Sequence, residues 1–195
     1  MIRIAIVTGS TRPGRNNLAV AQWVYDVAMA QKRPDAEFEF VDIIDYNLPL
    51  LDEPMPPSKG QYTHPHTKAW SEKIKSFDAY VFVTPEYNHG PSAALKNAVD
   101  YLHGEWADKA AGFVSYGAIG GARAAEHLRL VLASLDVATV RAQVMLSLFA
   151  DFEAFLTLKP APHREAEVRA MLDQLVRWGG ALKALRASSG TRAAA

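Results

Sequence analysis

The sequence of 195 residues contains no cysteine. This absence excludes disulfide bonds, cysteine-held iron–sulfur clusters and thiol catalysis. There is also no excess of charge, because 21 Lys and Arg residues balance 21 Asp and Glu residues. A protein that binds nucleic acid through phosphate contacts needs a surplus of positive charge, so we expect no nucleic-acid partner. The missing acidic surplus argues weakly against a carrier that docks on basic partners.

Long apolar runs are missing as well, and we therefore expect no membrane insertion. The first apolar run begins at residue 2 and leaves no room for a signal peptide, so we expect a soluble cytoplasmic protein. Hydrophobic residues make up 49% of the chain and charged residues 22%. This composition is sufficient for a hydrophobic core. The length is typical of one domain, which we place at residues 1–187, followed by a flexible tail at 188–195.

What the sequence does contain is an alternation of apolar, β-branched runs with longer helical patterns. This alternation predicts an α/β fold, in which a doubly wound parallel sheet carries helices on both faces. We expect strands near residues 3–7, 38–43, 79–84, 111–116 and 137–141. We expect helices near residues 16–31, 67–77, 91–102, 122–135 and 164–185.

Three loops that follow strands are unlike simple connectors. They are loop 1, "TGSTRPGRNN" at residues 8–17, loop 2, "TPEYNHG" at residues 84–90, and loop 3, "SYGAIGG" at residues 115–121. Open parallel sheets bind ligands beyond the carboxyl ends of their strands, where the strand order reverses. We therefore expect the three loops to meet at one edge of the sheet and to form the functional site.

Loop 1 has the composition of an anion site. Backbone N–H groups at a helix N-terminus bind phosphate readily, and Arg12 and Arg15 add positive charge. The dinucleotide fingerprint fails because Gly9 is followed by Ser-Thr. The nucleotide-hydrolase loop fails because Arg15-Asn16 replaces Lys-Ser/Thr, which removes the hydroxyl that would hold magnesium. A single terminal phosphate suits such a loop, although a capped helix with solvated arginines is an alternative.

Loops 2 and 3 are suited to a flat ring. Proline and glycine fix an irregular backbone that exposes N–H and C=O groups edge-on, and glycines let a ring approach without Cβ interference. The alternative is that both are ordinary loops, with Asn88 and Gly90 as turn residues. Glu86 would then be a solvated charge or a carboxylate at a helix N-terminus.

Other kinds of site find little support. The histidines at positions 64, 66, 103 and 163 show no metal-ligand spacing, so we expect no metal site. Ser10 and Ser115 lie outside the Gly-x-Ser-x-Gly motif of serine hydrolases. We name no catalytic side chain.

Three segments together resemble the NADPH-dependent FMN reductase family of flavodoxin-like proteins, which includes quinone, azo-dye and chromate reductases. They are "GSTRPGRNN", "TPEYNHGPSAALKNAVDYL" and "SYGAIGGARAAEHLRLVL", and they occur in the family order between residue 2 and about residue 150. The second segment is the most specific of the three. The resemblance implies a five-stranded flavodoxin-like sheet with strand order 2-1-3-4-5.

The resemblance also implies FMN as the bound cofactor and NADPH or NADH as co-substrate, with a quinone, azo compound or similar molecule as electron acceptor. It assigns Ser10, Arg12, Asn17 and, less firmly, Arg15 to the FMN phosphate. It assigns Pro85, Glu86, Tyr87 and Asn88 to the isoalloxazine ring, largely through backbone groups, and it places Ser115, Tyr116 and Gly117 beside the ring.

Two further expectations concern the assembly and the class of protein. The resemblance implies a homodimer or a larger assembly such as a tetramer, with Trp106 in the region of the subunit contacts. The apolar loop at residues 48–60 fits such a contact, and the alternative is that it packs on its own domain. A non-enzymatic electron carrier of the flavodoxin type and an FMN-binding regulatory module are the alternatives to an enzyme.

Overall fold

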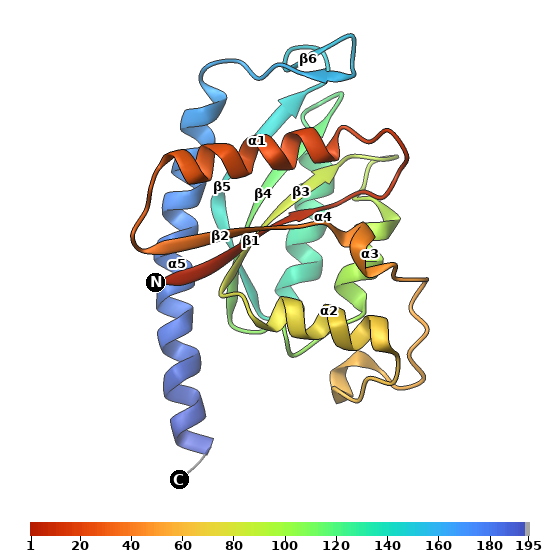
Figure 1. Ribbon diagram of the computed structural model, residues 1–195, viewed down its shortest axis with the longest axis vertical. Coiled ribbons are helices and arrows are strands. Elements are labelled where there is room, and N and C mark those ends of the chain that lie inside the picture. The colour runs from red at the N-terminus through yellow and green to blue at the C-terminus, as the bar shows by residue number, and fades with distance from the viewer. Residues whose placement is uncertain (194–195) are drawn as a thin grey trace.

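The computed structural model describes residues 1–193, with side chains described through residue 188. The strands and helices alternate along the chain as the apolar runs predict (Figure 1). The strands are β1 (Ile2–Thr8), β2 (Ala36–Val41), β3 (Ala79–Pro85), β4 (Lys109–Gly117), β5 (Val137–Ser147), β6 (Phe152–Glu153) and β7 (Thr157–Leu158). The α-helices are α1 (Asn17–Ala30), α2 (Pro65–Lys75), α3 (Ala93–Asp100), α4 (Ala122–Ala133) and α5 (Arg164–Ala193). Two short 3-10 helices, Ile43–Tyr46 and Pro57–Lys59, lie between β2 and α2.

The main sheet has five parallel strands in the order β2-β1-β3-β4-β5, which confirms the predicted flavodoxin-like topology. Every residue of β3 and β4 is buried, as expected for central strands covered on both faces. From β1 the chain adds β2 on one side, and it then adds β3, β4 and β5 on the other side. The strand order therefore reverses between β1 and β3. The carboxyl ends of these two strands therefore flank the crevice where such sheets bind ligands.

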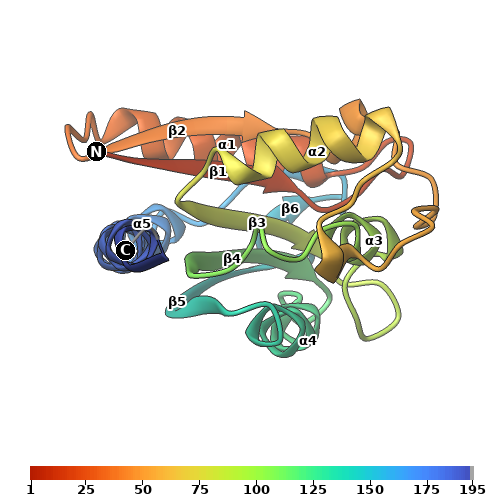
Figure 2. The ribbon, with the colours of Figure 1, turned by 90° about the horizontal axis from the view of Figure 1, so that it is seen from below.

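Two apolar cores cover the two faces of the sheet. Side chains of α1 and α5 pack on one face, and side chains of α2, α3 and α4 pack on the other. Figure 2 shows α5 on one side of β3–β5 and α3 and α4 on the opposite side. Trp106 lies in the second core, fully buried, and its indole N–H donates to Val99 O at 3.1 Å. The expectation that Trp106 lies at a subunit contact is therefore wrong, because its ring fills the core of its own subunit.

The sequence underestimates the length of β5, which continues to Ser147 instead of ending near residue 141. Polar residues Arg141 and Gln143 interrupt the apolar pattern, but β5 is an edge strand and exposes part of its length. A register shift opposite Ala111 and Phe113 lets the pairing with β4 continue. The short hairpin of β6 and β7 was not predicted, because neither strand is longer than two residues.

The last helix is also longer than predicted. The sequence suggests a tail from residue 188, yet α5 continues to Ala193, whereas residues 194–195 lie outside the described part of the chain. Lys183 and Arg186 hold this end of α5 against the sheet, because both donate to the Asp78 carboxylate. Within residues 1–193, no helix combines the length and the apolar character that crossing a membrane requires.

The amino-terminal edge of the sheet is closed by paired charges. Asp78 also accepts a hydrogen bond from Arg3 N at 3.0 Å. Burial alone would raise the pKa of Asp78, but Lys183 and the other donors hold it below its usual value. The amine of Lys109 is buried and donates to Ile74 O and to Tyr80 OH, and burial lowers the pKa of Lys109 to about 7.

Candidate functional site

The three predicted loops meet at the carboxyl edge of the sheet. Loops 1 and 2 are joined by a hydrogen bond of 3.1 Å between Ser10 Oγ and Tyr87 OH. Loops 2 and 3 are joined by Glu86 N, which donates to Tyr116 O at 2.9 Å. The loops thus form one continuous surface beyond β1, β3 and β4, on the side of the sheet opposite the chain termini (Figure 1).

The start of loop 1 is held tightly against β3. A Cβ on Gly9 would lie 2.5 Å from Val83 O, so only glycine fits there. The buried amide of Asn17 accepts from Gly9 N at 2.8 Å and donates to Val83 O at 2.9 Å. Ser92 Oγ donates to Gly9 O. The side chain of Asn17 therefore holds the turn of loop 1 in place.

The N-terminus of α1 lacks the features that usually neutralise a helix end. Asn16, at the cap position, makes no capping hydrogen bond, and its Nδ2 donates instead to Phe155 O at 2.8 Å. The first turn also contains no acidic residue. The first N–H groups of a helix have no partner within the helix and carry partial positive charge. Together with the exposed Arg12 they give loop 1 the character of an anion site.

Arg15 is fixed rather than free. Its side chain is 7% exposed and forms an ion pair with Asp42, which also accepts from Thr8 Oγ1 at 2.7 Å. The Nε of Arg15 is buried and has no hydrogen-bond partner, and an uncompensated buried donor of this kind is costly. Asp42 was missed by the sequence analysis. In the structure it directly follows β2, which ends at Val41, whereas the sequence analysis placed residue 42 inside the strand predicted at residues 38–43.

Loop 2 is a tight turn. Tyr87 and Gly90 exchange backbone hydrogen bonds of 2.9 and 3.1 Å across two residues in the left-handed conformation, Asn88 at φ 47° and His89 at φ 75°. Asparagine tolerates this conformation, whereas histidine adopts it less readily. Asn88 is thus a turn residue, and the turn presents the exposed side chains of Tyr87, Asn88 and His89.

The carboxylate of Glu86 serves the neighbouring helix. Its side chain is 5% exposed, forms an ion pair with Arg123 and accepts from Arg123 N at 3.1 Å at the start of α4. Burial alone would raise the pKa of Glu86, but the hydrogen bonds and charge of Arg123 hold it below its usual value. Of the two alternatives to a ligand contact, the helix N-terminal carboxylate is the one observed.

Loop 3 depends on glycine. Gly121 has φ +71°, and a Cβ there would lie 2.7 Å from Tyr116 N. Ser115 is fully buried, and its Oγ donates to Gly120 O at 2.7 Å, so its hydroxyl shapes the loop. Tyr116 is 6% exposed, and burial raises its pKa, which keeps the phenol neutral.

The eleven predicted site residues thus divide by exposure. The structure brings them all to one edge. Those with buried or mostly buried side chains or backbone are Ser10, Arg15, Asn17, Pro85, Glu86, Ser115, Tyr116 and Gly117. Those with exposed side chains are Arg12, Tyr87 and Asn88. The buried set builds the loops, and the exposed set is free to contact a ligand through its side chains.

Two cavities help to locate binding. The larger, about 490 Å³, lies at the other end of the sheet, where Lys59, Lys75, Lys109 and Arg186 line it. The amine of Lys109 and the guanidinium of Arg186 already have partners there, so volume alone does not make this cavity the site. A smaller cavity of about 170 Å³ adjoins loop 1 at Thr11.

Comparison with known proteins gives a consistent result. The model of the family described as NADPH-dependent FMN reductase matches residues 2–151. The NAD(P)H-dependent FMN reductase ntnL of Nectria sp is 44% identical over 140 residues, which cover 68% of this chain and 70% of that protein. The quinone reductase of Escherichia coli is 35% identical over 142 residues, which cover 69% and 71%.

A solved structure supports the fold. FerB, a flavoenzyme NAD(P)H:(acceptor) oxidoreductase from Paracoccus denitrificans, superposes with a TM-score of 0.70 at 22% identity, covering 91% of this chain and 98% of that one. At this identity the likeness concerns the fold alone. The family model and the curated relatives carry the assignment, and the chain belongs to the NADPH-dependent FMN reductase family.

Proposed function

We propose that this chain is an FMN-dependent oxidoreductase that oxidises NADPH or NADH and reduces a quinone, azo compound or similar small acceptor. With a quinone, NAD(P)H, one proton and the quinone yield NAD(P)⁺ and the hydroquinone. The observation that carries the proposal is the uncapped N-terminus of α1 beside Arg12, because it offers a site for an anion. Family membership supports the same activity.

The residues of loop 1 fit a single terminal phosphate. Arg12 and the first N–H groups of α1 would hold it, with the hydroxyl of Ser10 at its edge. Arg15 has one N–H to spare, the buried Nε, and Asp42 keeps its guanidinium in one position. Asn17 would act through the loop, since its amide already bonds Gly9 and Val83.

Loops 2 and 3 fit the edge and face of a planar ring. The backbone of Pro85, Glu86, Tyr87 and Asn88 would contact the ring edge, and Gly117 would allow close approach from the other loop. Ser115 and Tyr116 would support this surface, because Ser115 Oγ is committed to Gly120 O and Tyr116 is mostly buried.

When bound, FMN supplies the hydride-accepting and electron-donating chemistry. The residues of this chain would position the cofactor and would exclude water from the side of it that they cover. No side chain has to move a proton, so we assign no catalytic residue. If both substrates use the same open face, the kinetics are ping-pong.

We further propose a homodimer or larger assembly located in the cytoplasm. Leu50, Leu51 and Met55 are 81%, 41% and 42% exposed on the loop before α2, which supports a subunit contact there. Dependence on NAD(P)H supports a compartment that regenerates this dinucleotide. Light scattering at micromolar concentration tests the assembly, and a monomer both with and without FMN would contradict it. Cell fractionation tests the location.

The activity is tested on the purified chain. Heat releases a non-covalent cofactor, and mass spectrometry identifies it. We expect FMN, together with NAD(P)H oxidation that requires a quinone or azo acceptor. FAD, or no flavin after reconstitution, would contradict the proposal. FMN bound without NAD(P)H oxidation would favour a carrier or a regulatory module.

A further inference from the structure

An apolar surface borders the three loops and is not used by the proposed cofactor contacts. It consists of Phe149, Phe155 and Leu156, which are 71%, 53% and 70% exposed, and we call it the apolar wall. The rings of Phe149 and Phe155 pack edge to face with centroids 5.4 Å apart. Three large apolar side chains that are exposed and close together indicate a surface that contacts another molecule.

The base of the hairpin is rigidly anchored. Asp151 is fully buried, accepts from Ser147 N at 2.8 Å and from Ala161 N at 3.2 Å, and forms an ion pair of 3.1 Å with Arg164. Phe152 packs on Tyr116 with ring centroids 5.9 Å apart. The position of the apolar wall is therefore fixed by the fold and does not depend on a ligand.

The tip of the hairpin is strained. Ala154 and Phe155 have φ values of 49° and 62°, a conformation that glycine or asparagine adopts more easily. Such a backbone conformation is energetically unfavourable for residues other than glycine. The backbone of Phe155 serves the fold by accepting from Asn16, but this hydrogen bond does not require an exposed apolar side chain at position 155, so a contact with another molecule is the better reason for the aromatic residue.

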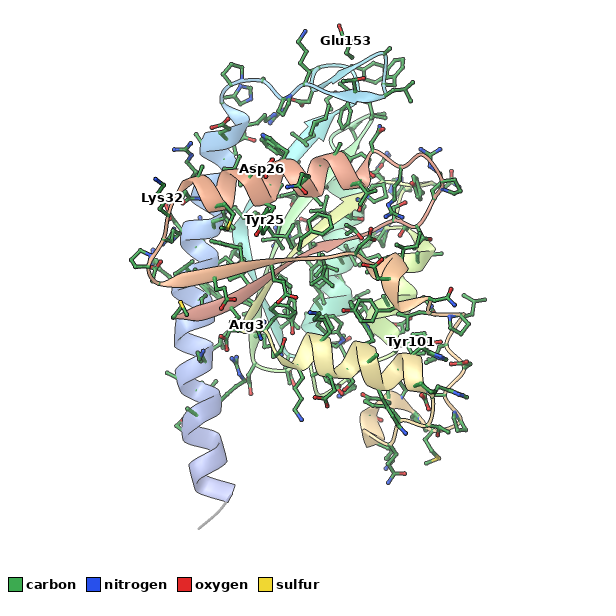
Figure 3. All side chains as sticks on the ribbon, viewed as in Figure 1. Arg3, Tyr25, Asp26, Lys32, Tyr101 and Glu153 are labelled. Carbon is green, nitrogen blue, oxygen red and sulfur yellow. The ribbon has the colours of Figure 1, made fainter. Side chains whose placement is uncertain are left out.

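The apolar wall lies against the proposed cofactor site. Asn16, at the start of α1, donates to Phe155 O at 2.8 Å. On the other side, Leu148 N donates to Gly117 O at 3.0 Å, which places Phe149 directly after a residue bonded to loop 3. The hairpin stands beyond the end of β5 (Figure 1), and Glu153, labelled in Figure 3, marks its outer end above α1.

We propose that the apolar wall is a subsite for the apolar substituent of the electron acceptor, so that the preferred acceptors are quinones with an alkyl side chain. This inference rests on the proposed function. A buried aromatic side chain covers about 150–250 Å², so the three partly exposed side chains offer roughly 300–400 Å². An alkyl chain can cover such an area. A standard protein interface buries about 800 Å² on each partner, which is more than the apolar wall supplies.

The charges around the hairpin favour the same occupant. Its exposed charged residues, Glu153 and Lys159, have opposite signs and cancel. An anionic membrane surface would select a basic cluster, which this part of the hairpin does not provide. A neutral, apolar ligand is the one that requires no compensating charge.

The test compares two quinones that share one ring, one without an alkyl chain and one with a decyl chain. For each protein the quantity of interest is the ratio of kcat/KM for the decyl quinone to that for the short quinone. The ratio cancels any change common to both acceptors, such as a lower FMN content. The variants are Phe155→Asn, which suits the left-handed backbone, and the double variant Phe155→Asn/Leu156→Ser. The matched control is Leu130→Ser, because Leu130 is 74% exposed on α4.

We expect the ratio to fall about tenfold in the double variant, less in Phe155→Asn, and not at all in Leu130→Ser. An unchanged ratio in the double variant would overturn the subsite. A fall in the ratio together with a lower mass in light scattering would also overturn it, because the apolar wall would then be a subunit contact. If the wild-type chain reduces neither quinone, the subsite fails, and if it also reduces no azo dye, the proposed function fails with it. If the wild-type chain reduces the quinones and the ratio is unchanged in the double variant, the proposed subsite alone is contradicted.

Discussion

The two ends of the same sheet differ in how fully their polar groups are paired. At the amino-terminal edge, polar groups pair with one another, as Asp78 does with Lys183 and Arg186 and as Lys109 does with Tyr80. At the carboxyl edge, donors are left over: α1 has no capping hydrogen bond, and the Nε of Arg15 has no partner. The carboxylate of Asp78 and the amine of Lys109 are thus satisfied within the chain, whereas we propose that a ligand completes the carboxyl edge. Mutations at the first end should therefore change stability, and mutations at the second should change binding.

The largest effect should come from the backbone of loop 3. Gly121→Ala places a Cβ 2.7 Å from Tyr116 N at φ +71°, whereas Gly14→Ala has a similar φ of +66° with no atom within 4 Å. We expect Gly121→Ala to lower the free energy of unfolding by about 3 kcal/mol and to weaken FMN binding. The control Gly14→Ala should cost only about 1 kcal/mol. Urea titration measures both, and equal losses would mean that strain alone, not the close contact, sets the cost.

The amino-terminal edge should respond differently. Asp78→Asn removes the acceptor charge for Lys183 and Arg186, and it should lower the free energy of unfolding by about 2 kcal/mol at pH 7. The lowered pKa of Asp78 means that this stabilisation is present above the usual carboxyl pKa and is lost as the pH falls through the folded value. The affinity for FMN should not change. A large loss of affinity in this variant would contradict the separation of the two ends.

At the carboxyl edge, Arg12→Ala should affect ligand binding and leave stability nearly unchanged, because Arg12 is exposed. The loss of a charge-assisted contact costs about 1.5–3 kcal/mol. FMN affinity should therefore fall about tenfold to a hundredfold, while riboflavin affinity, which involves no phosphate, should hardly change. Titration of each flavin by fluorescence gives the two affinities. Equal losses for both would show that Arg12 acts on the fold.

The smallest effect concerns Lys109. Its pKa of about 7 lies below the usual 10.5, so between these values the unfolded chain holds a proton that the folded chain has released. The free energy of unfolding should therefore rise with pH in this window, by at most about 1.4 kcal/mol per pH unit. Lys109→Met should lack this slope. Urea titrations of both proteins at pH 7, 8 and 9 provide the comparison, and parallel pH profiles would show that Lys109 keeps a normal pKa.

The sequence predicts the parts of this fold that follow from local apolar patterns. The runs at β1, β3 and β4 are continuous because both faces of these strands are covered, and the order 2-1-3-4-5 was implied by the family resemblance. The extension of β5 and the hairpin of β6 and β7 could not be read in the same way. Their pairing depends on a register shift against β4 and on the anchor at Asp151.

The site shows the same division. The sequence identifies loops 1, 2 and 3 because unusual glycine, proline and polar residues follow apolar strands. It does not show that the side chains of Asn17 and Ser115 form hydrogen bonds with backbone groups, or that Glu86 forms an ion pair with Arg123. Glu86 lies 37 residues from Arg123, and Asn17 lies 66 residues from Val83, one of its two backbone partners. Only the folded chain brings them together, so residue type alone cannot separate loop-building residues from ligand contacts.

Hydrogen exchange with and without FMN tests the central claim most directly, because it covers both ends of the sheet in one measurement. We expect FMN to slow amide exchange in residues 9–17, 85–90 and 117–121 at the carboxyl edge. We expect no change in residues 57–60 and 103–109, two segments that supply most of the residues lining the cavity of about 490 Å³ at the other end. Protection at that cavity, with none in the three loops, would contradict the account.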